Sequence, residues 1–400
     1  MKIGLLREEK MPADERVALT PLQCKILKER YPNVELVVMS SSIRCFSDEM
    51  YISEGVKIVN NLFDCDVLIG IKEVSKSSLI ANKTYLYFSH TIKEQPYNRD
   101  LLNMMIQLNI TMVDYEVLKA QNGKRLLGFG RFAGIVGAYN GFLTYGLKSG
   151  KYNLNPAHSC KDRVELENEL SKIVLADEKI IVTGNGRVGH GIMEIMKKSG
   201  INEVSKFEFL NNKFDEPVFV HLDVIDYNER SDGSESDKYD FYKNPKLYKS
   251  SFMKYAKKAD IFIAGHYYSA DSPYLFTRED AKSPGFNLKV VADISCDIDG
   301  PVASTIRPSS IADPIYGYNP ISEVEGSFLQ EGNIAVMAVD NLPCELPKDA
   351  SKNFGNALLE NILPLLINGD NEGIIENATI CKNGDLTLNF EYLREYIDGN

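Results

Sequence analysis

The sequence predicts an α/β protein with two domains, each built around a mainly parallel β-sheet. Short apolar segments alternate with helical patterns over residues 2–125, and a second alternation of the same kind begins near Glu178. Parallel strands that are covered on both faces read as short apolar runs joined through helices, which matches this pattern. A chain of 400 residues is long enough for two such domains, at about 150 residues each.

Composition excludes several classes of function. Hydrophobic residues make up 44% of the chain and charged residues 25%, as in globular proteins with a sizeable core. The formal net charge of −11 argues against a nucleic-acid partner, because such binding depends on an excess of Lys and Arg. No apolar run approaches the roughly 20 residues of a membrane helix, and the N-terminus has no signal-peptide pattern.

The cysteines give no sign of a metal site or of a disulfide framework, because no C-x-x-C pair and no Cys/His cluster occurs. We therefore predict no metal and a reducing, cytoplasmic compartment. The seven cysteines are Cys24, Cys45, Cys65, Cys160, Cys296, Cys344 and Cys381.

In the first half, the pattern assigns a short segment to each strand and helix. Thr20 followed by Pro21 marks a helix start, since threonine caps the first N–H groups and proline fits the first helical position. The small residues and aromatics of Gly128–Gly150 predict a helix packed closely against another element, either linking the domains or lying in an ordinary core. The other expected strands and helices are Ile3–Leu6, Val34–Met39, Asp66–Ile71, Thr84–Phe88 and Thr111–Tyr115 as strands, and Pro21–Arg30 and Tyr97–Gln107 as helices.

In the second half, a strand at Ile180–Val182 leads into a glycine-rich turn and a helix that ends at Gly200. The polar segment 227–250 is rich in Ser and Asp and predicts a mobile surface loop. The remaining expectations are strands at Val204–Leu210, Ala259–Ala264 and Lys289–Ile294, a crossing between domains at Ile306–Asn333, an apolar segment at Val336–Asn341 and a long helix from Pro347 to Ile367.

The glycine-rich turn has the spacing G-x-G-x-x-G, at Gly184, Gly186 and Gly189. Between a strand and a helix, this spacing is typical of a Rossmann-like dinucleotide site: the first glycine permits the tight turn, the second the approach of a pyrophosphate, and the third close helix packing. N–H groups at the helix start, around Arg187 and Val188, would face the phosphates. The alternative is a turn of the same shape that binds no ligand.

The residue that would select between NAD and NADP is not clear from the sequence. An acidic residue about 20 positions after the fingerprint would bind the ribose of NAD. Glu208 is in range, and Lys213 could instead meet the 2′-phosphate of NADP. We expect an NAD(P)(H) cofactor, with NADP(H) slightly favoured. His266 and Asp297 follow two further strands and are expected to face the same crevice.

Charged residues also follow the strands of the first half. Arg16 precedes the first helix, Lys72-Glu73 and His90 follow two strands, and Glu116 follows a third. Strand ends of a parallel sheet meet at one edge, so these groups should converge on an interdomain cleft opposite the glycine turn. Arginine suits a carboxylate, and a desolvated lysine and a histidine suit proton transfer. The alternatives are a surface Lys–Glu ion pair and a structural histidine.

A family resemblance rests on these and neighbouring motifs. KIGLLREEKMPADERVALTP resembles the start of the alanine dehydrogenase, transhydrogenase-alpha and saccharopine dehydrogenase superfamily. TYLYFSHTIKEQPYNRDLLNMMIQLNITMVDYE resembles the lysine–ketoglutarate reductase half of the aminoadipic semialdehyde synthases, that is, an L-lysine-forming saccharopine dehydrogenase. GFGRFAGIVGAYNG, DISCDIDG and AVDNLPCELPKDASKNFG fit the same family. The resemblance covers nearly the whole chain.

The resemblance implies a discontinuous substrate and catalytic domain, residues 1–130 plus 335–400, and a dinucleotide-binding Rossmann domain, residues 131–334. It further implies roles for individual residues. These are Lys72 and His90 as the acid/base pair, Arg16 on a substrate carboxylate, Glu116 in the substrate site, and Asp297 and Asn341 beside the nicotinamide. The charges of the neighbouring residues add further substrate-binding candidates: Lys93 and Arg125 for carboxylates, and Glu73 to orient the bases or accept an ammonium group. Arg187 departs from the family pattern, which has a smaller polar residue in the glycine turn.

The implied activity is the NAD(P)-dependent interconversion of saccharopine with L-lysine and 2-oxoglutarate. The alternatives are an alanine dehydrogenase-like enzyme and a non-catalytic NAD(P)-binding homologue. The expected partners are small-molecule amino and 2-oxo acids, with no nucleic acid and no membrane. The oligomeric state stays open, a homodimer being one option.

Overall fold

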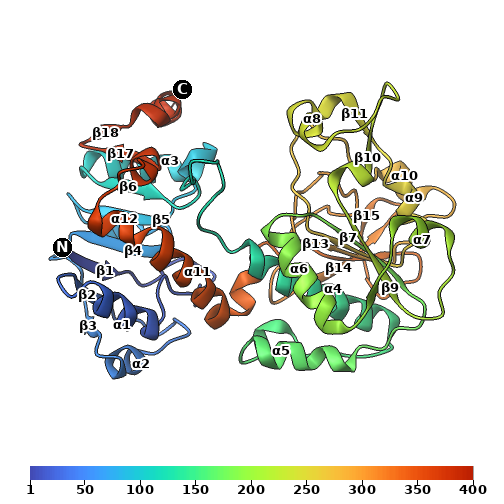
Figure 1. Cartoon of the computed structure of the whole chain (residues 1–400), viewed down its shortest axis with the longest axis horizontal. Coiled ribbons are helices and arrows are strands. Elements are labelled where there is room, and N and C mark those ends of the chain that lie inside the picture. The colour runs from blue at the N-terminus through green and yellow to red at the C-terminus, as the bar shows by residue number, and fades with distance from the viewer. Residues whose placement is uncertain (400) are drawn as a thin grey trace. The chain divides into compact units, whose positions relative to one another are not determined.

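The computed structural model describes residues 1–399 and divides them into two compact units (Figure 1). Unit 1 comprises Met1–Phe129 together with the described residues from Pro347 onward, and unit 2 comprises Gly130–Leu346. The sequence analysis gave residues 335–346 to the first domain. The structure gives them to unit 2, because strand β16 (Ile334–Met337) pairs with two strands of that unit.

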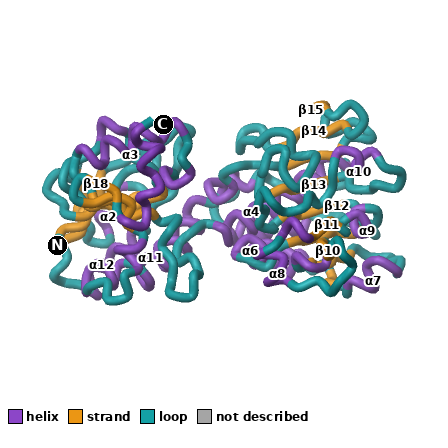
Figure 2. Tube along the Cα trace, turned by 90° about the horizontal axis from the view of Figure 1, so that it is seen from above, coloured by secondary structure: helices purple, strands orange, loops and turns teal. Residues whose placement is uncertain are grey.

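Unit 1 is a mainly parallel sheet in the order β18-β17-β6-β5-β4-β1-β2-β3, in which β17 and β18 are antiparallel. In Figure 2, α3 lies on one side of this sheet and α11 and α12 on the other. The strands are β1 (Lys2–Leu5), β2 (Glu35–Met39), β3 (Lys57–Val59), β4 (Val67–Lys72), β5 (Thr84–Phe88), β6 (Thr111–Asp114), β17 (Thr379–Lys382) and β18 (Asp385–Leu386). The helices are α1 (Pro21–Arg30), α2 (Asp48–Ser53), α3 (Pro96–Gln107), α11 (Pro347–Asn361), α12 (Leu363–Asn368), α13 (Ile374–Asn377) and α14 (Arg394–Asp398).

Unit 2 repeats the plan with the order β15-β14-β16-β13-β12-β7-β9-β8, in which β14 and β15 are antiparallel. Helices α4 and α6 lie on one side of this sheet and α7 and α9 on the other (Figures 1 and 2). The strands other than β16 are β7 (Lys179–Thr183), β8 (Asn202–Glu203), β9 (Val218–Leu222), β10 (Asn228–Arg230), β11 (Tyr248–Ser250), β12 (Ile261–Ala264), β13 (Val290–Asp293), β14 (Ile315–Asn319) and β15 (Val324–Gly326). The helices are α4 (Gly130–Ser149), α5 (Arg163–Glu169), α6 (Arg187–Ser199), α7 (Lys206–Asn211), α8 (Lys238–Lys243), α9 (Met253–Ala256) and α10 (Arg278–Lys282).

The predicted α/β class with two mainly parallel sheets is confirmed. Local signals also agree where they are strong: Thr20 caps α1 in a reciprocal capping box with Gln23, and Gly200 ends α6 in the left-handed region. Helix α4 packs closely against α6, as its small residues predicted. A Cβ on Gly134 would lie 2.0 Å from the carbonyl oxygen of Val188, so only glycine permits this approach.

Three predicted segments of unit 2 are wrong. Ile306–Asn333 does not cross between domains, because it lies wholly within unit 2 and carries β14 and β15 of that unit's sheet. Val204–Leu210 is not a strand: Ser205 accepts the N–H of Glu208 and starts helix α7, and the strand beside β7 is β9. The segment 227–250 is not a plain loop, because β10 and β11 pair antiparallel and α8 lies between them. In unit 1, the expected long helix is divided into α11 and α12, because Pro364 cannot donate a helical hydrogen bond.

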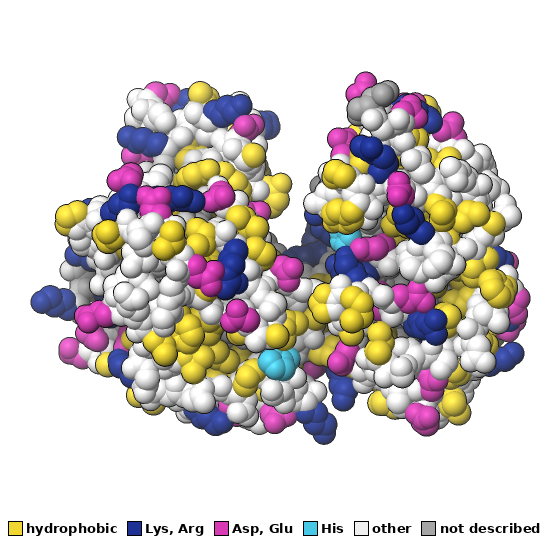
Figure 3. Space-filling view, turned by 180° about the vertical axis from the view of Figure 1, so that it is seen from behind, with side chains coloured by type: hydrophobic (Ala, Val, Ile, Leu, Met, Phe, Trp, Pro, Cys, Tyr) yellow, Lys and Arg dark blue, Asp and Glu magenta, His cyan; other side chains and the backbone are white. Residues whose placement is uncertain are grey.

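Residues 1–399 give no sign of a membrane helix, a disulfide or a metal-binding cluster. No described helix combines the length and the apolar character that crossing a membrane requires. No disulfide joins any two cysteines, and no group of His, Cys, Asp and Glu side chains is arranged to hold a metal ion in this part of the chain. Figure 3 shows acidic and basic side chains interspersed on the visible face of each unit.

Candidate functional site

Each unit collects chemically capable side chains at the carboxyl ends of its parallel strands. In unit 1, a register shift between Ile69 and Lys72 interrupts the pairing of β4 with β5 and places Lys72 opposite Phe88. Such an irregularity re-aims the side chains that follow it. Glu73, the residue that follows β4, contacts His90, which lies just past the end of β5.

Glu73 joins two basic side chains. Its Oε2 lies 3.0 Å from His90 Nδ1, and its Oε1 accepts a hydrogen bond from Lys10 Nζ at 2.5 Å. Burial raises the pKa of the Glu73 carboxyl, but the His90 and Lys10 hydrogen bonds outweigh it and bring that pKa down to about 2. Glu73 is therefore a fixed negative charge that orients the His90 ring. Lys10 is a member of this group that the sequence analysis missed, because it lies 63 residues from Glu73.

Lys72 has the environment of a proton carrier. Burial lowers the pKa of its amine, and the nearby Arg16 and Lys10 cations lower it further, while Asp14 and Glu73 oppose the shift. The amine is therefore easier to deprotonate near neutral pH than an exposed lysine, which is what general acid/base chemistry requires.

His90 is held in an unusual backbone conformation by a buried carboxylate. Its φ of +56° lies in the left-handed region, which non-glycine residues rarely adopt. Asp114, at the end of β6, accepts hydrogen bonds from the Ser89 hydroxyl, from the Ser89 N–H at 3.0 Å and from the Glu116 N–H at 2.6 Å. Burial raises the pKa of Asp114. One side chain therefore fixes the loops that carry both His90 and Glu116.

Arg16 is buried, with 2% of its surface exposed, and it already grips a carboxylate. Its Nε and Nη2 donate to Asp14 at 2.9 and 2.6 Å, and the guanidinium lies 4.2 Å from the centre of the Phe129 ring. Burial raises the pKa of Asp14, but Arg16 more than offsets this and lowers it. The arginine fork expected to hold a substrate carboxylate thus has an internal partner.

The other predicted substrate residues form a second group. Glu116 lies 3.5 Å from Lys93 Nζ and 3.9 Å from Arg125 Nη1, and the Arg125 guanidinium is 5.5 Å from the centre of the Phe88 ring. Two cations around one carboxylate leave a net positive charge, which suits an anionic substrate group.

Glu8, which the sequence analysis did not select, supports a prediction for stability. It accepts the N–H groups of Ile71 at 2.7 Å and Lys72 at 2.9 Å. Burial and the charge of Asp14 nevertheless raise the pKa of its carboxyl from 4.5 to about 8. The folded chain keeps a proton that the unfolded chain releases above pH 4.5, so the free energy of unfolding of unit 1 should fall by about 3 kcal/mol between pH 5 and 8.

Urea unfolding, monitored by hydrogen exchange of the β1 and β4 amides, would measure how the free energy of unfolding changes between pH 5 and 8. Glu8→Gln should remove most of it, whereas Glu360→Gln, on an exposed face of α11, should leave it unchanged. A slope that survives in Glu8→Gln would contradict the assignment.

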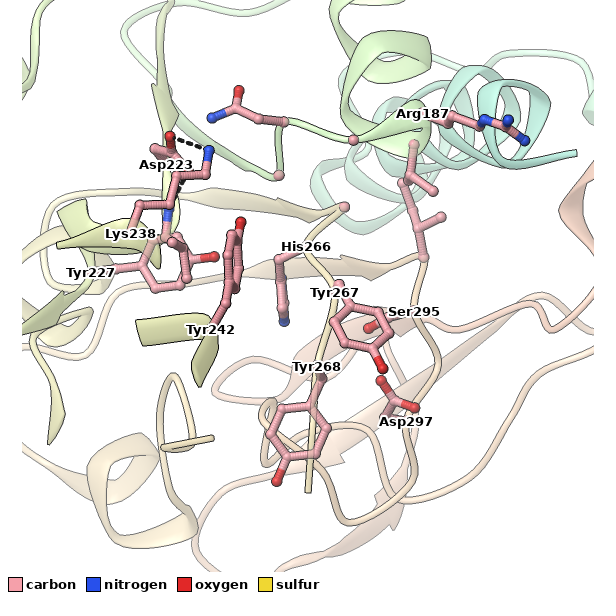
Figure 4. Close-up of a pocket in the computed structure, with 17 residues that line it drawn as sticks. Arg187, Asp223, Tyr227, Lys238, Tyr242, His266, Tyr267, Tyr268, Ser295 and Asp297 are labelled. Atoms are coloured by element: carbon pink, nitrogen blue, oxygen red, sulfur yellow. Dashed lines mark hydrogen bonds and ion pairs between the residues drawn. The ribbon is translucent and has the colours of Figure 1, made fainter. Parts of the chain in front are cut away.

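Unit 2 forms a pocket of about 600 Å³ where β7, β9, β12 and β13 end. Among its lining residues are Gly184, Gly186, Asp223, His266, Ser295 and Asp297. Figure 4 shows Asp223, Lys238, Tyr227 and Tyr242 on one side of His266, and Tyr267, Tyr268 and Asp297 on the other. Parallel strands bind ligands at this edge.

The three glycines of the turn differ in what surrounds them. Gly184 has a φ of +101°, and a Cβ there would lie 2.2 Å from the carbonyl oxygen of Gly265. A Cβ on Gly189, in the first turn of α6, would lie 1.9 Å from the carbonyl oxygen of Gly184. A Cβ on Gly186 would meet nothing within 4 Å. Gly186 therefore borders open space at the N-terminus of α6, where a phosphate would be bound.

Asp223 is an acidic residue at the pocket that the sequence motifs did not single out. It directly follows β9, lines the pocket, and lies 2.7 Å from Lys238 Nζ. The two residues proposed from sequence, Glu208 and Lys213, are not among the described residues that line the pocket. A strand at Val204–Leu210 would place the acidic residue near Glu208, whereas the strand beside β7 is β9, which ends directly before Asp223.

His266 lies at the base of the pocket, with 6% of its surface exposed. Its Nδ1 is 2.9 Å from the Thr183 hydroxyl, while its Nε2 is buried and has no hydrogen-bond partner among the described residues. Burial lowers the pKa of its ring to about 4, so the ring is neutral at pH 7. A buried polar atom without a partner usually meets a ligand or water.

The structure places some of the other predicted cofactor residues at the pocket and others away from it. Val188 and Asp297 line the pocket, and burial raises the pKa of Asp297. Arg187 belongs to the lining, but in Figure 4 its side chain points away from His266 and Asp223. Asn341, which precedes a 3-10 turn at Leu342–Glu345, is not among the described lining residues.

A buried aspartate also fixes the loop that carries Asp297. Asp293, the last residue of β13, accepts hydrogen bonds from Ser295 Oγ at 2.9 Å, the Cys296 N–H at 3.2 Å and Thr305 Oγ1 at 2.7 Å. Burial raises the pKa of Asp293. The glycine turn, the open space at Gly186 and the unpartnered His266 nitrogen together fit a dinucleotide.

Comparison with known proteins agrees with this geometry. Two family models match the chain: the N-terminal domain of alanine dehydrogenase/PNT over residues 4–136, and its C-terminal domain over residues 175–391. The structure is similar to an L-alanine dehydrogenase, with a TM-score of 0.67 and 15% identity over 99% of this chain and 100% of that one. It is also similar to a transhydrogenase from Sinorhizobium meliloti, with a TM-score of 0.58 and 15% identity over 96% and 98% of the two chains.

Among curated proteins, the chain is 28% identical to an alpha-aminoadipic semialdehyde synthase of Arabidopsis thaliana, over 98% of this chain and 41% of that protein. It therefore spans less than half the length of that relative. It is 26% identical to a saccharopine dehydrogenase (NAD(+), L-lysine-forming) of Yarrowia lipolytica, over 90% of this chain and 91% of that protein.

Proposed function

Because the chain belongs to the alanine dehydrogenase/PNT family of oxidoreductases, we propose that it interconverts saccharopine with L-lysine and 2-oxoglutarate, using a nicotinamide cofactor. The observation that carries this proposal is the unit 1 cluster, in which Glu73 binds the His90 ring and its charge also acts on Lys72, a lysine of lowered pKa. The similarity to L-lysine-forming saccharopine dehydrogenases extends over 90% of this chain, which favours the same substrates.

The proposal assigns proton transfer to two side chains. Lys72, as a neutral amine, would remove a proton from the substrate ammonium group, and His90 would hold and return the proton exchanged at the carbon–nitrogen centre. Glu73 would keep the His90 ring in one orientation through its Nδ1. Two groups with different environments are needed because the reaction both takes up and releases protons.

Substrate carboxylates would be held by the cations of unit 1. Lys93 and Arg125 lie 3.5 and 3.9 Å from Glu116 and are partly exposed, so an anionic group could reach them. Arg16 would bind a carboxylate by sharing its guanidinium between the substrate and Asp14. Glu116 would accept hydrogen bonds from the substrate ammonium group.

The unit 2 pocket would hold the cofactor, with the pyrophosphate at Gly186 and the start of α6 and the adenosine near Asp223 and His266. When bound, the nicotinamide supplies or accepts the hydride. Asp297 and Asn341 remain our candidates for contacts near the nicotinamide. The lean toward NADP(H) depended on Lys213, so the choice between cofactors now depends on the residues around Asp223.

Turnover with defined substrates tests the proposal. Oxidation of NADH or NADPH should require L-lysine and 2-oxoglutarate together, and saccharopine should reduce NAD(P)+ in the reverse direction. Alanine with pyruvate should be inert. Turnover of alanine would favour an alanine dehydrogenase-like activity, and nucleotide binding without turnover of any amino or oxo acid would favour a non-catalytic homologue.

Two further assignments belong to the proposal. We propose a reducing, cytoplasmic compartment, because the spacing of the cysteines in the sequence forms no disulfide framework. The oligomeric state stays open, with a homodimer as one option that size-exclusion chromatography with light scattering would decide.

A further inference from the structure

The pocket of unit 2 contains an ion pair where the proposed function places the adenosine of the cofactor. Asp223 follows β9 and accepts the N–H of Val224 at 2.7 Å through Oδ1. Its Oδ2 lies 2.7 Å from Lys238 Nζ. Lys238 is the first residue of α8, which lies between β10 and β11. The side chains of both residues are about one-third exposed, at 32% and 30%, so a ligand can reach them.

We propose that Lys238 is the residue that admits the 2′-phosphate of NADP(H), so that this pocket accepts both NAD(H) and NADP(H). A lone carboxylate at this position accepts hydrogen bonds from the ribose hydroxyls of NAD and repels a phosphate dianion. The Lys238 ammonium cancels that repulsion and offers three donors. This inference rests on the proposed function, because it takes the pocket to be the dinucleotide site.

Nearby cations do not provide the same contact. Lys213, on the chain after α7, is exposed and is not among the described lining residues. Lys206 is paired with Asp226 at 2.6 Å and is likewise outside the described lining. The Arg187 side chain points away from Asp223 in Figure 4. Lys238 is therefore the lining cation that lies against the ribose-reading carboxylate.

In this proposal, the two cofactors differ in the side-chain partners of Asp223 and Lys238. With a 2′-hydroxyl, Asp223 keeps Lys238 as its partner and accepts from the ribose. With a 2′-phosphate, Lys238 turns from the carboxylate to the phosphate. Tyr242, which also comes from α8, lies beside Lys238 in Figure 4. The segment between β10 and β11 therefore supplies both the Lys238 ammonium group and the Tyr242 ring to the part of the pocket beside Asp223.

Calorimetry with two small probes tests the inference without turnover. Adenosine 5′-monophosphate and adenosine 2′,5′-bisphosphate differ only in the 2′-phosphate. Lys238→Ala should weaken binding of the bisphosphate by about ten- to a hundredfold, the range expected when a charged hydrogen bond is lost, while the monophosphate changes little. The loss should shrink in high salt, because the pair is partly exposed.

Matched variants separate a local effect from a general loss of positive charge. Lys213→Ala should bind both probes as the unchanged chain does, and Lys238→Arg should retain the bisphosphate. Asp223→Asn should favour the bisphosphate over the monophosphate. Circular dichroism would confirm that each variant is folded.

Three results would overturn the inference. These are equal weakening of both probes in Lys238→Ala, no weakening of either, or an unchanged chain that binds only the monophosphate. None of them touches the assignment of substrates, which the turnover assay with lysine and 2-oxoglutarate decides separately. Failure of that assay with selective loss of the bisphosphate in Lys238→Ala would leave the inference standing and remove the proposed reaction.

Discussion

Replacement of Gly189 by alanine is expected to destabilise unit 2 and weaken nucleotide binding, whereas Gly186→Ala should weaken binding without destabilising the unit. The added methyl group at Gly189 would lie 1.9 Å from the carbonyl oxygen of Gly184, which is backbone and cannot move without opening the turn. Such overpacking should lower the free energy of unfolding by about 3 kcal/mol. At Gly186, φ is −86° and no atom lies within 4 Å of the new Cβ.

The two variants therefore separate a structural glycine from one that makes room for a ligand. Gly186→Ala should unfold within about 0.5 kcal/mol of the unchanged chain and weaken nucleotide binding by at least about tenfold through contact with the pyrophosphate. Hydrogen exchange over β7 and α6 would locate the loss of stability, and calorimetry would measure binding. Normal nucleotide affinity in Gly186→Ala would show that no phosphate lies against this residue.

Replacement of Lys72 by methionine should reduce kcat/KM for saccharopine formation by about 10²- to 10⁴-fold, the range for removal of a general acid or base. Stability should not fall, since methionine fills a similar volume and removes the cost of burying an amine between Arg16 and Lys10. The pH profile of kcat/KM should also lose one limb, which a purely structural role would not produce.

Lys76→Met is the matched control for this variant. Lys76 lies in the same strand-end region but is exposed and paired with Asp100 at 2.9 Å, so its loss should leave kcat/KM within about twofold. If Lys72→Met retains full activity and an unchanged pH profile, proton transfer by Lys72 is wrong, and His90 or water must carry both protons.

The sequence was sufficient where one short motif determines the local structure. Thr20-Pro21 marks the start of α1, and the glycine spacing marks the turn between β7 and α6. Residues at strand ends, such as Lys72 and His90, could also be selected, because a parallel sheet brings its carboxyl ends to one edge. Their grouping needs only the strand order, and not the details of packing.

The sequence was insufficient where contacts join segments that are far apart in the chain, and where one segment suits both a strand and a helix. Val204–Leu210 contains apolar residues suited to a strand, yet the capping box of Ser205 and Glu208 favours a helix. A strand at Val204–Leu210 places the expected acidic residue near Glu208, and not at Asp223, which follows β9. The contacts of Lys10 with Glu73 and of Lys238 with Asp223 depend on how loops pack, and no periodic pattern records them. The register shift ahead of Lys72 spans Gly70, and a lone glycine within a strand pattern indicates such an irregularity only weakly.

The two buried aspartates at strand ends bear on how quickly and tightly small molecules are captured. Asp114 and Asp293 tie down the neighbouring loops with internal hydrogen bonds, so those loops have their shape before any ligand arrives. Association then loses little conformational entropy at these points, and more of the contact energy remains as affinity. We expect slow amide exchange at Ser89 and Cys296 in the empty protein, with little further slowing when nucleotide or substrate is added.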